Sequence, residues 1–353
     1  MLRPIKRLGY SIEVITSEMA GAVYLNNPFV DKLSIKRDGD LPGGDIKNWY
    51  AWFESRSREY DLFAHLSHTC EGRHALNVNQ TAFWWPQDYR RKLCAGSYLE
   101  TVHDVAGVAY EFGPLYFPSE EESERAAATK AKIGDNYVAW VISGSRVDKV
   151  YPYAAMAIGR IIKELGTPVV MVGAGGKQFE MAKQIMEHVR RQNSTTGRLG
   201  MEIDGLPAVD GLYLALSPDG ADPGGEKHWS LRRSLAQTLA ADLVISPDTG
   251  FAWAAAFEPM PKIVTLSHAS AENITKHWVN TTTLHADPVK VPCWPCHRLH
   301  DGIETCVPNK DGGNAAACIS DITVETIVSE ADRLLRGRSS MGNVVPLREA
   351  AAE

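Results

Sequence analysis

The sequence contains few cysteines, no long apolar run and no strong excess of charge of either sign. Six cysteines among 353 residues are too few for a fold held together by disulfides. The longest apolar stretches, residues 167–173 and 251–257, are far shorter than the roughly 20 residues that a helix needs to cross a bilayer, so we expect no membrane-spanning helix. The first residues carry no apolar run of the kind found in secretory signals, and the cytoplasm is therefore the expected location.

The formal net charge is −6 and the pI is about 6.0, which gives the chain no overall attraction to nucleic acid or to an anionic membrane. We therefore expect no nucleic-acid partner, although a local basic groove and peripheral contact with a membrane stay open. Hydrophobic residues make up 44% and charged residues 23% of the chain, which is ordinary for a folded globular protein. At roughly 150 residues per domain, the length predicts two domains.

Short apolar runs alternate with helical patterns along the whole chain, and this alternation is typical of a parallel sheet covered by helices. In the first half we expect strands at 11–16, 30–35 and 61–66 and helices at 46–58 and 85–94. In the second half we expect strands at 137–143, 168–172, 211–215, 242–246 and 262–266, and helices at 154–165, 177–190, 231–241, 250–257 and 322–335.

The pattern predicts an α/β protein with two doubly wound, Rossmann-like domains that face a cleft. Near residues 113–124 the composition changes to Pro, Ser and Glu, which indicates a domain boundary there or shortly after. The expected parts are an acceptor-side domain (1–125), a second domain (126–336) with a cysteine-rich insert (293–318), and a flexible tail (337–353).

Three strands of the second half are followed by loops that suit a phosphate, because ligands of such sheets bind at the carboxyl ends of the strands. The first loop carries Ser145, Arg146 and Lys149, and the second carries Gly173 and Gly175. The third loop, Asp248-Thr249-Gly250, directly precedes a helix, whose free N–H groups and dipole favour an anion. The alternative is that the glycines only permit tight turns and that Asp248 or Thr249 caps the helix.

A polar segment, residues 266–278, follows the last expected strand. His268 and Lys276 offer donors and Glu272 an acceptor for a sugar or nucleotide, so we count His268 among the donor-binding residues. A well-bonded surface loop is the alternative. The aromatic rings of Trp84, Trp85 and Trp253 can stack on a sugar or base, or belong to the core.

Four of the six cysteines lie close together near the C-terminus, with histidines between them. Thiolates at this density suit a tetrahedral zinc ion, and we expect a structural zinc site. Two disulfides or reduced thiols are the alternatives, and a haem attachment pattern is disfavoured because it requires export. The expected zinc ligands are Cys293, Cys296, Cys306 and Cys318.

The segments 144–182 and 231–268 make the chain resemble the heptosyltransferase-like glycosyltransferases of family 9, which have the GT-B fold. The resemblance implies a nucleoside diphosphate sugar as donor, similar to ADP-heptose, and a hydroxyl acceptor, with the core of lipopolysaccharide favoured. It also implies inversion at the sugar without a catalytic metal. Lys149 is expected to contact the phosphates, and Asp248, Thr249 and Gly250 to grip the diphosphate and sugar.

Two departures from that family matter. Trp253 stands where many members have a histidine. The first strand of the family, with a Gly-Asp turn whose aspartate is the usual candidate base, is not found before residues 1–8. Either the natural chain begins ~20–25 residues earlier, or another base acts, for which we expect His68 and Glu71. A catalytically inactive protein that binds a nucleotide sugar or a glycan is the alternative function. A dinucleotide-dependent oxidoreductase is disfavoured because no GxGxxG motif with a downstream acid is present.

Overall fold

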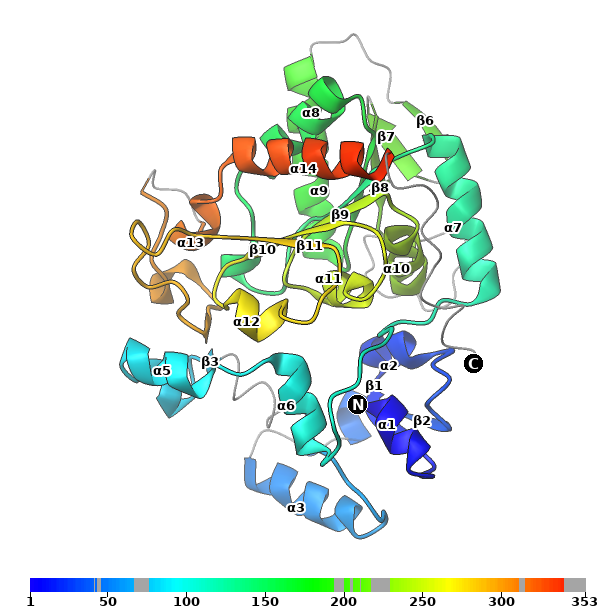
Figure 1. The fold of residues 1–353 in the computed structure, drawn as a ribbon, viewed down its shortest axis with the longest axis vertical. Helices are drawn as coiled ribbons and strands as arrows, with labels where there is room; N and C mark the ends of the chain where they lie inside the picture. The colour runs from blue at the N-terminus through cyan, green and yellow to red at the C-terminus, as the bar shows by residue number, and fades with distance from the viewer. Residues whose placement is uncertain are drawn as a thin grey trace.

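The computed structural model describes residues 1–40, 42, 46–66, 76–193, 200–203, 206–209, 211–216, 229–310 and 315–339. Its C-terminal half is built on an eight-stranded sheet of order β11-β10-β9-β4-β5-β8-β7-β6 (Figure 1). The strands from β11 to β8 run parallel, and β7 and β6 continue the edge antiparallel. The strands are β4 (Val138–Val141), β5 (Val169–Val172), β6 (Gly200–Ile203), β7 (Leu206–Val209), β8 (Leu212–Ala215), β9 (Leu243–Pro247), β10 (Lys262–Leu266) and β11 (Thr281–His285).

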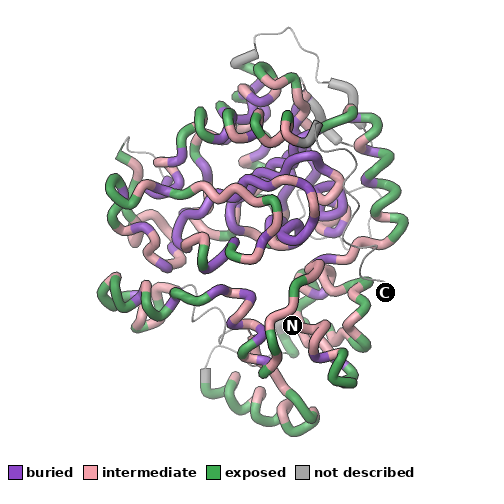
Figure 2. The backbone as a smooth tube through the Cα atoms, in the orientation of Figure 1, coloured by how far each residue is buried: buried purple, intermediate pink, exposed green. Residues whose placement is uncertain are grey.

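Helices cover both faces of this sheet. Along β4, Val138 and Trp140 pack in one hydrophobic cluster while Ala139 and Val141 pack in another, because successive side chains of a strand point to opposite faces. The first cluster is closed by α8 (Ala154–Leu165), α9 (Gly176–Asn193) and α14 (Val324–Ser339), and the second by α7 (Glu120–Ile133), α10 (Leu231–Leu239) and α11 (Gly250–Ala255). Burial on both faces explains why the parallel strands are nearly all apolar (Figure 2).

The N-terminal half is smaller and has less buried surface (Figure 2). Strand β1 pairs with β2 in a parallel two-stranded sheet, and α1, α2 and α3 lie beside it in Figure 1. Figure 1 shows α5 and α6 between α3 and the half that holds the large sheet. The bounds are α1 (Leu2–Arg7), β1 (Glu13–Ser17), α2 (Glu18–Tyr24), β2 (Lys32–Lys36), α3 (Ile46–Ser57), β3 (Leu76–Asn77), α5 (Gln87–Leu93) and α6 (Tyr98–Val105).

Short elements complete the fold around the large sheet. They are the single-turn 3-10 helices η1 (Asp38–Asp40), η2 (Thr81–Trp84), η3 (Val147–Lys149) and η4 (Ile303–Thr305), together with α12 (Ala271–Ile274), β12 (Arg298–Leu299) and α13 (Ala317–Ser320). None of the helices within the described ranges is both long and apolar enough to pass through a bilayer.

Most expected elements are confirmed, and one is wrong. Every strand and helix expected between residues 137 and 335 is present, with its ends shifted by a few residues, whereas β6, β7 and β11 were not expected. The expected strand at 61–66 has no regular structure. Phe63 packs against Phe53 and Tyr60, so the apolar pattern of this segment serves packing on α3 rather than pairing in a sheet.

The domain limits expected from the sequence can be compared with the bounds of the helices. The proposed boundary between residues 125 and 126 lies within α7, and α14 continues to Ser339, three residues into the expected tail. The rest of that tail, residues 340–353, lies outside the described residues.

Arg232 joins the two halves of the chain. It is buried at the start of α10, and its guanidinium bonds Glu122 of α7 at 2.6 and 2.5 Å. The same group donates to the carbonyl oxygens of Ala22 and Leu25, at 2.7 and 3.1 Å, and so reaches the end of α2. At the other end of the molecule, β3 pairs with β12, which places the N-terminal half against the cysteine-rich insert. These contacts fix the two halves relative to each other.

Candidate functional site

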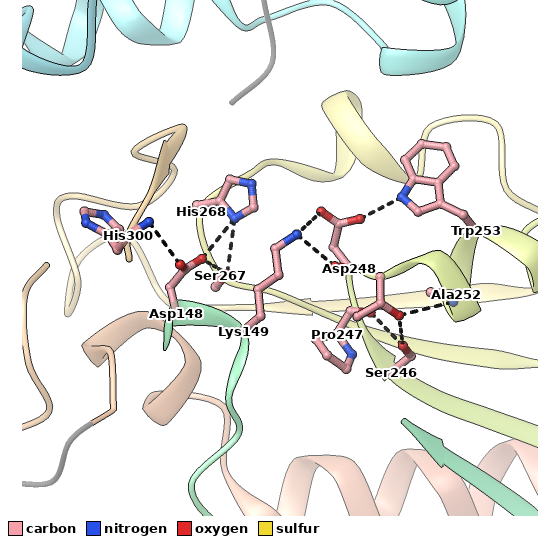
Figure 3. A network of polar contacts seen from close by, with 11 residues as sticks. Asp148, Lys149, Ser246, Pro247, Asp248, Ala252, Trp253, Ser267, His268 and His300 are labelled. Carbon is pink, nitrogen blue, oxygen red and sulfur yellow. Dashed lines mark hydrogen bonds and ion pairs between the residues drawn. The ribbon is translucent and has the colours of Figure 1, made fainter. Parts of the chain in front are cut away.

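Three neighbouring strands of the large sheet, β10, β9 and β4, end at the same edge because they run parallel. The residues that follow β4 form η3, those after β9 lead into α11, and those after β10 lead into α12. As a result, segments far apart in the chain bring their polar side chains together at this edge (Figure 3). The residues concerned are Asp148, Lys149, Asp248, Ser267 and His268.

Lys149 lies directly against Asp248. Its Nζ donates to the carbonyl oxygen of Asp248 at 2.9 Å and to the Oδ2 atom at 3.0 Å (Figure 3). An ammonium group has three N–H donors, so these two bonds leave one for a ligand. The side chain reaches Asp248 by crossing Gly144 closely, since a Cβ on Gly144 would lie 2.6 Å from the Cδ atom of Lys149. We did not predict Gly144 as a site residue. Its position in the same loop as Lys149 could have indicated it.

Asp248 is buried and held from two sides. Its Oδ1 atom accepts a hydrogen bond of 2.8 Å from the indole Nε1 of Trp253, one turn into α11. Burial favours the neutral acid, but the charge of Lys149 and the two hydrogen bonds outweigh it, and the pKa of Asp248 is held below its ordinary value. Trp253, noted in the sequence as a departure, therefore positions the carboxylate that pairs with Lys149.

Thr249 caps α11, which was the alternative interpretation of this loop. Its Oγ1 accepts from the backbone N of Ala252 at 3.4 Å and lies 3.1 Å from the Oγ atom of Ser246. Gly250, the first residue of the helix, is exposed, and a Cβ there would meet no heavy atom within 4 Å. Although Thr249 caps the helix, the space around Gly250 stays open.

Asp148, next to Lys149, forms a second polar group that the sequence did not single out. It is 1% exposed. Its Oδ2 accepts from Ser267 Oγ at 2.8 Å and from His268 Nδ1 at 3.2 Å, and its Oδ1 accepts from the backbone N of His300 at 3.3 Å. Burial raises the pKa of this carboxyl, but the hydrogen bonds and the charges of His268 and Lys149 lower it further, to about 2. Two features of the sequence could have indicated Asp148: it precedes Lys149, and the pair Ser267-His268 follows a predicted strand.

The other residues expected in the first two loops make different contacts. Ser145 is exposed, and Arg146 pairs with Asp301 and donates to Asn77 Oδ1 at 3.3 Å. The loop that carries Gly173 and Gly175 is closed by Gln178, whose Oε1 accepts from the N atom of Ala174 at 2.6 Å. A Cβ on Gly173 would lie 2.3 Å from that Oε1 atom, and Gly175 has a φ of +93°. Here the glycines meet the needs of a tight turn.

The polar segment after β10 divides into two parts. His268 belongs to the Asp148 group, whereas Lys276 pairs with Glu272 at 2.8 Å and with Glu100 at 3.1 Å. Trp84 and Trp85 are exposed on the N-terminal half. The expected catalytic residues His68 and Glu71 lie outside the described residues.

The four clustered cysteines meet at one cavity of about 170 Å³, which His268 and Asp148 also line. All four are free thiols, so the alternative of two disulfides is not formed. Burial raises the pKa of Cys296 and of Cys306 to about 12. In the parts of the chain that the structure describes, no three His, Cys, Asp or Glu side chains are arranged so that they could hold a metal ion. The four cysteines therefore share a cavity without the arrangement of ligands that the expected zinc site needs. The ligands expected there are Cys293, Cys296, Cys306 and Cys318.

Comparison with known proteins gives matches in structure but not in sequence. No protein-family profile matches the chain, and no curated protein matches it. The structure described as glycosyl transferase family 9 from Veillonella parvula is 15% identical, with a TM-score of 0.55 over 95% of this chain and 92% of that one. The E. coli ADP-heptose lps heptosyltransferase II is 14% identical, with a TM-score of 0.53 over 96% of this chain and 94% of that one. The chain therefore has the GT-B fold that these two transferases share.

Proposed function

We propose that the chain is a glycosyltransferase that transfers a sugar from a nucleoside diphosphate sugar to a hydroxyl group of an acceptor. The observation that carries the proposal is the Lys149–Asp248 pair at the carboxyl edge of β4 and β9, in a chain with the GT-B fold. Lys149 has one N–H donor left after its bonds to Asp248, and it can give this donor to an oxygen of the diphosphate.

The chemical step needs stabilisation of the leaving diphosphate. As the bond between the anomeric carbon and the phosphate oxygen breaks, negative charge grows on the diphosphate, and a cation already fixed in place stabilises that charge. Lys149 is fixed by Asp248, and Asp248 by Trp253, so this cation is positioned before the donor binds. Gly250 offers open space beside it, which leaves room for the close approach of a phosphate.

The remaining assignments extend the proposal by resemblance. An ADP-heptose-like donor is favoured, because one similar structure is described as an ADP-heptose lps heptosyltransferase. Inversion at the sugar, catalysis without a metal, and lipopolysaccharide core as acceptor follow from the same family resemblance. We assign the donor contact chiefly to Lys149, Asp248, Thr249 and Gly250, because Lys149 and Asp248 pair at this edge and Gly250 borders open space. Arg146 pairs instead with Asp301, and Gln178 closes the loop of Gly173 and Gly175.

Titration calorimetry with ADP, UDP and GDP, followed by assays of sugar release from the matching sugar nucleotides, tests the proposal. We expect one nucleoside diphosphate to bind and its sugar nucleotide to be turned over. The Lys149→Met variant should bind it more weakly, whereas Lys177→Met, an exposed lysine at the start of α9, should not. Binding without turnover on any acceptor supports the alternative of an inactive binding protein, and no binding of any nucleotide rejects both.

A further inference from the structure

We infer that His268 is the group that takes the proton from the attacking hydroxyl, and that Asp148 is the residue that positions it. This inference rests on the proposed function. It concerns two side chains from different loops: Asp148 comes from η3 after β4, and His268 follows the end of β10. In the sheet, β9 lies between β4 and β10, and the segments that follow β4 and β10 reach across its end so that the two side chains meet.

The hydrogen bonds determine which ring nitrogen of His268 carries the proton. Asp148 is ionised, so its carboxylate can only accept hydrogen bonds. The Nδ1 atom of His268, 3.2 Å from Oδ2, must therefore donate, and in the neutral ring Nε2 is then left with a lone pair. Figure 3 shows this second nitrogen pointing away from Asp148, toward the side on which the cyan N-terminal segments lie.

Asp148 has the surroundings of a carboxylate that supports a histidine base. It is almost fully buried and receives three hydrogen bonds, from Ser267, His268 and the backbone of His300, which hold it in one orientation. A buried carboxylate of this kind fixes the tautomer of its histidine and stabilises the imidazolium that forms when the ring accepts a proton. The His268 residue is itself 3% exposed, and it lines the cavity of about 170 Å³.

The His268–Asp148 pair lies next to the proposed donor site. Asp148 and Lys149 are consecutive residues of η3, and they reach His268 and Asp248 respectively. Figure 3 shows His268 and Asp248 on either side of the Lys149 side chain. In an inverting displacement the acceptor hydroxyl attacks from the face of the sugar opposite the leaving diphosphate. The sugar would therefore lie between Lys149, which holds the diphosphate, and His268, which takes the proton.

The acceptor oxygen forms a bond to the anomeric carbon while its proton moves to Nε2 of His268. The bond from that carbon to the phosphate oxygen breaks, and the diphosphate leaves with the electron pair beside Lys149. The imidazolium, paired with Asp148, later loses its proton to water. With water as the acceptor, the same step hydrolyses the donor to free sugar and nucleoside diphosphate.

Hydrolysis of ADP-heptose by the full chain, together with ADP binding measured by calorimetry, tests the inference. His268→Ala and His268→Gln should bind ADP as the parent does and hydrolyse the donor about 10²–10⁴-fold more slowly. Added imidazole should restore part of the activity of His268→Ala, because the small base can occupy the space of the lost ring. His188→Gln, an exposed histidine on α9, is the matched control and should retain full activity.

A split between kcat and KM separates a positioning role for Asp148 from a purely structural one. The groups that act electrostatically with His268 are Asp148, Asp248 and His300, and its cavity also contains Arg90, Arg298, Glu304 and the four cysteines. Asp148→Asn keeps the shape of the side chain but removes the carboxylate that accepts from Nδ1 of His268, so it should lower kcat for hydrolysis while the KM for the donor and the affinity for ADP stay near those of the parent. A folded Asp148→Asn variant with an unchanged kcat, or one that also loses ADP binding, contradicts the positioning role.

The remaining outcomes distinguish the inference from the function on which it rests. Full activity in folded His268→Ala, or loss of hydrolysis with ADP binding retained in His68→Ala or Glu71→Gln instead, overturns the assignment of His268. A parent chain that binds ADP but hydrolyses no ADP-heptose overturns it as well. A parent chain that binds no nucleoside diphosphate overturns the proposed function itself.

Discussion

Lys149 bonds both the carboxylate and the carbonyl oxygen of Asp248, although 99 residues separate the two in the chain. Both side chains are largely buried, at 13% and 10% exposure, so water screens the pair only weakly. The pair is therefore the fixed point of the proposed donor site. It ties the loop after β4 to the loop after β9.

Loss of the Lys149 charge should weaken nucleotide binding. A hydrogen bond to a charged group contributes about 1.5–3 kcal/mol, so Lys149→Met should lower the affinity for ADP by about 10- to 100-fold, measured by calorimetry. The single variant also leaves Asp248 as an unpaired buried carboxylate. The double variant Lys149→Met, Asp248→Asn also removes the unpaired charge, so it should recover stability without recovering affinity for ADP. Recovery of affinity in the double variant would contradict a direct contact between Lys149 and the diphosphate.

Trp253→Phe should destabilise the Asp248 carboxylate. The change retains a ring but deletes the 2.8 Å hydrogen bond to Oδ1, at a cost of roughly 1.5–3 kcal/mol in the free energy of unfolding. Trp278→Phe is the matched control, because the indole nitrogen of Trp278 is buried and has no hydrogen-bond partner among the described residues, and its ring packs against Trp253. Denaturant unfolding should show a smaller loss for Trp278→Phe. Equal losses would mean that the hydrogen bond contributes little.

Acid should remove the stabilisation that Asp148 provides. The pKa of Asp148 is depressed in the folded state to about 2, below its ordinary value, so its contribution is complete at higher pH and is lost as the pH falls toward 2. A depression of this size corresponds to on the order of 2 kcal/mol. The difference in the free energy of unfolding between the parent and Asp148→Asn should therefore shrink between about pH 5 and pH 2. A difference that stays constant over this range would show that Asp148 acts through packing alone.

The cysteine cavity should bind zinc in the purified, reduced protein. Elemental analysis should find about one zinc per chain, and Cys296→Ser with Cys306→Ser should abolish it. Because burial keeps these thiols protonated, binding should release protons, which a pH indicator detects during titration with zinc. Cys94→Ser changes a buried cysteine that does not line the cavity and serves as the control. Protein with neither zinc nor proton release contradicts the site.

The alternation of apolar runs and helical patterns was sufficient to predict the large parallel sheet, because each buried strand and each amphipathic helix carries its pattern locally. The segment at 61–66 has the same apolar composition, and its prediction as a strand was wrong. A strand exists only where a neighbour supplies hydrogen bonds, and Phe63 finds its contacts on α3 instead. β11, a strand of three threonines, a leucine and a histidine, has no apolar pattern, and it forms where it pairs with β10 and packs Leu284 on the core.

By itself, the sequence determined which loops follow the strands and that Lys149 and Asp248 occupy two of them, since chain order fixes which residue ends each strand. Only the tertiary structure decided the partners. The order of β10, β9 and β4 in the sheet brings His268 to Asp148 and Asp248 to Lys149, turns Arg146 toward Asp301, and gathers four cysteines at one cavity. The physical reason is that hydrogen bonds and ion pairs act over a few ångströms in space, and distance along the chain does not reveal which side chains come that close.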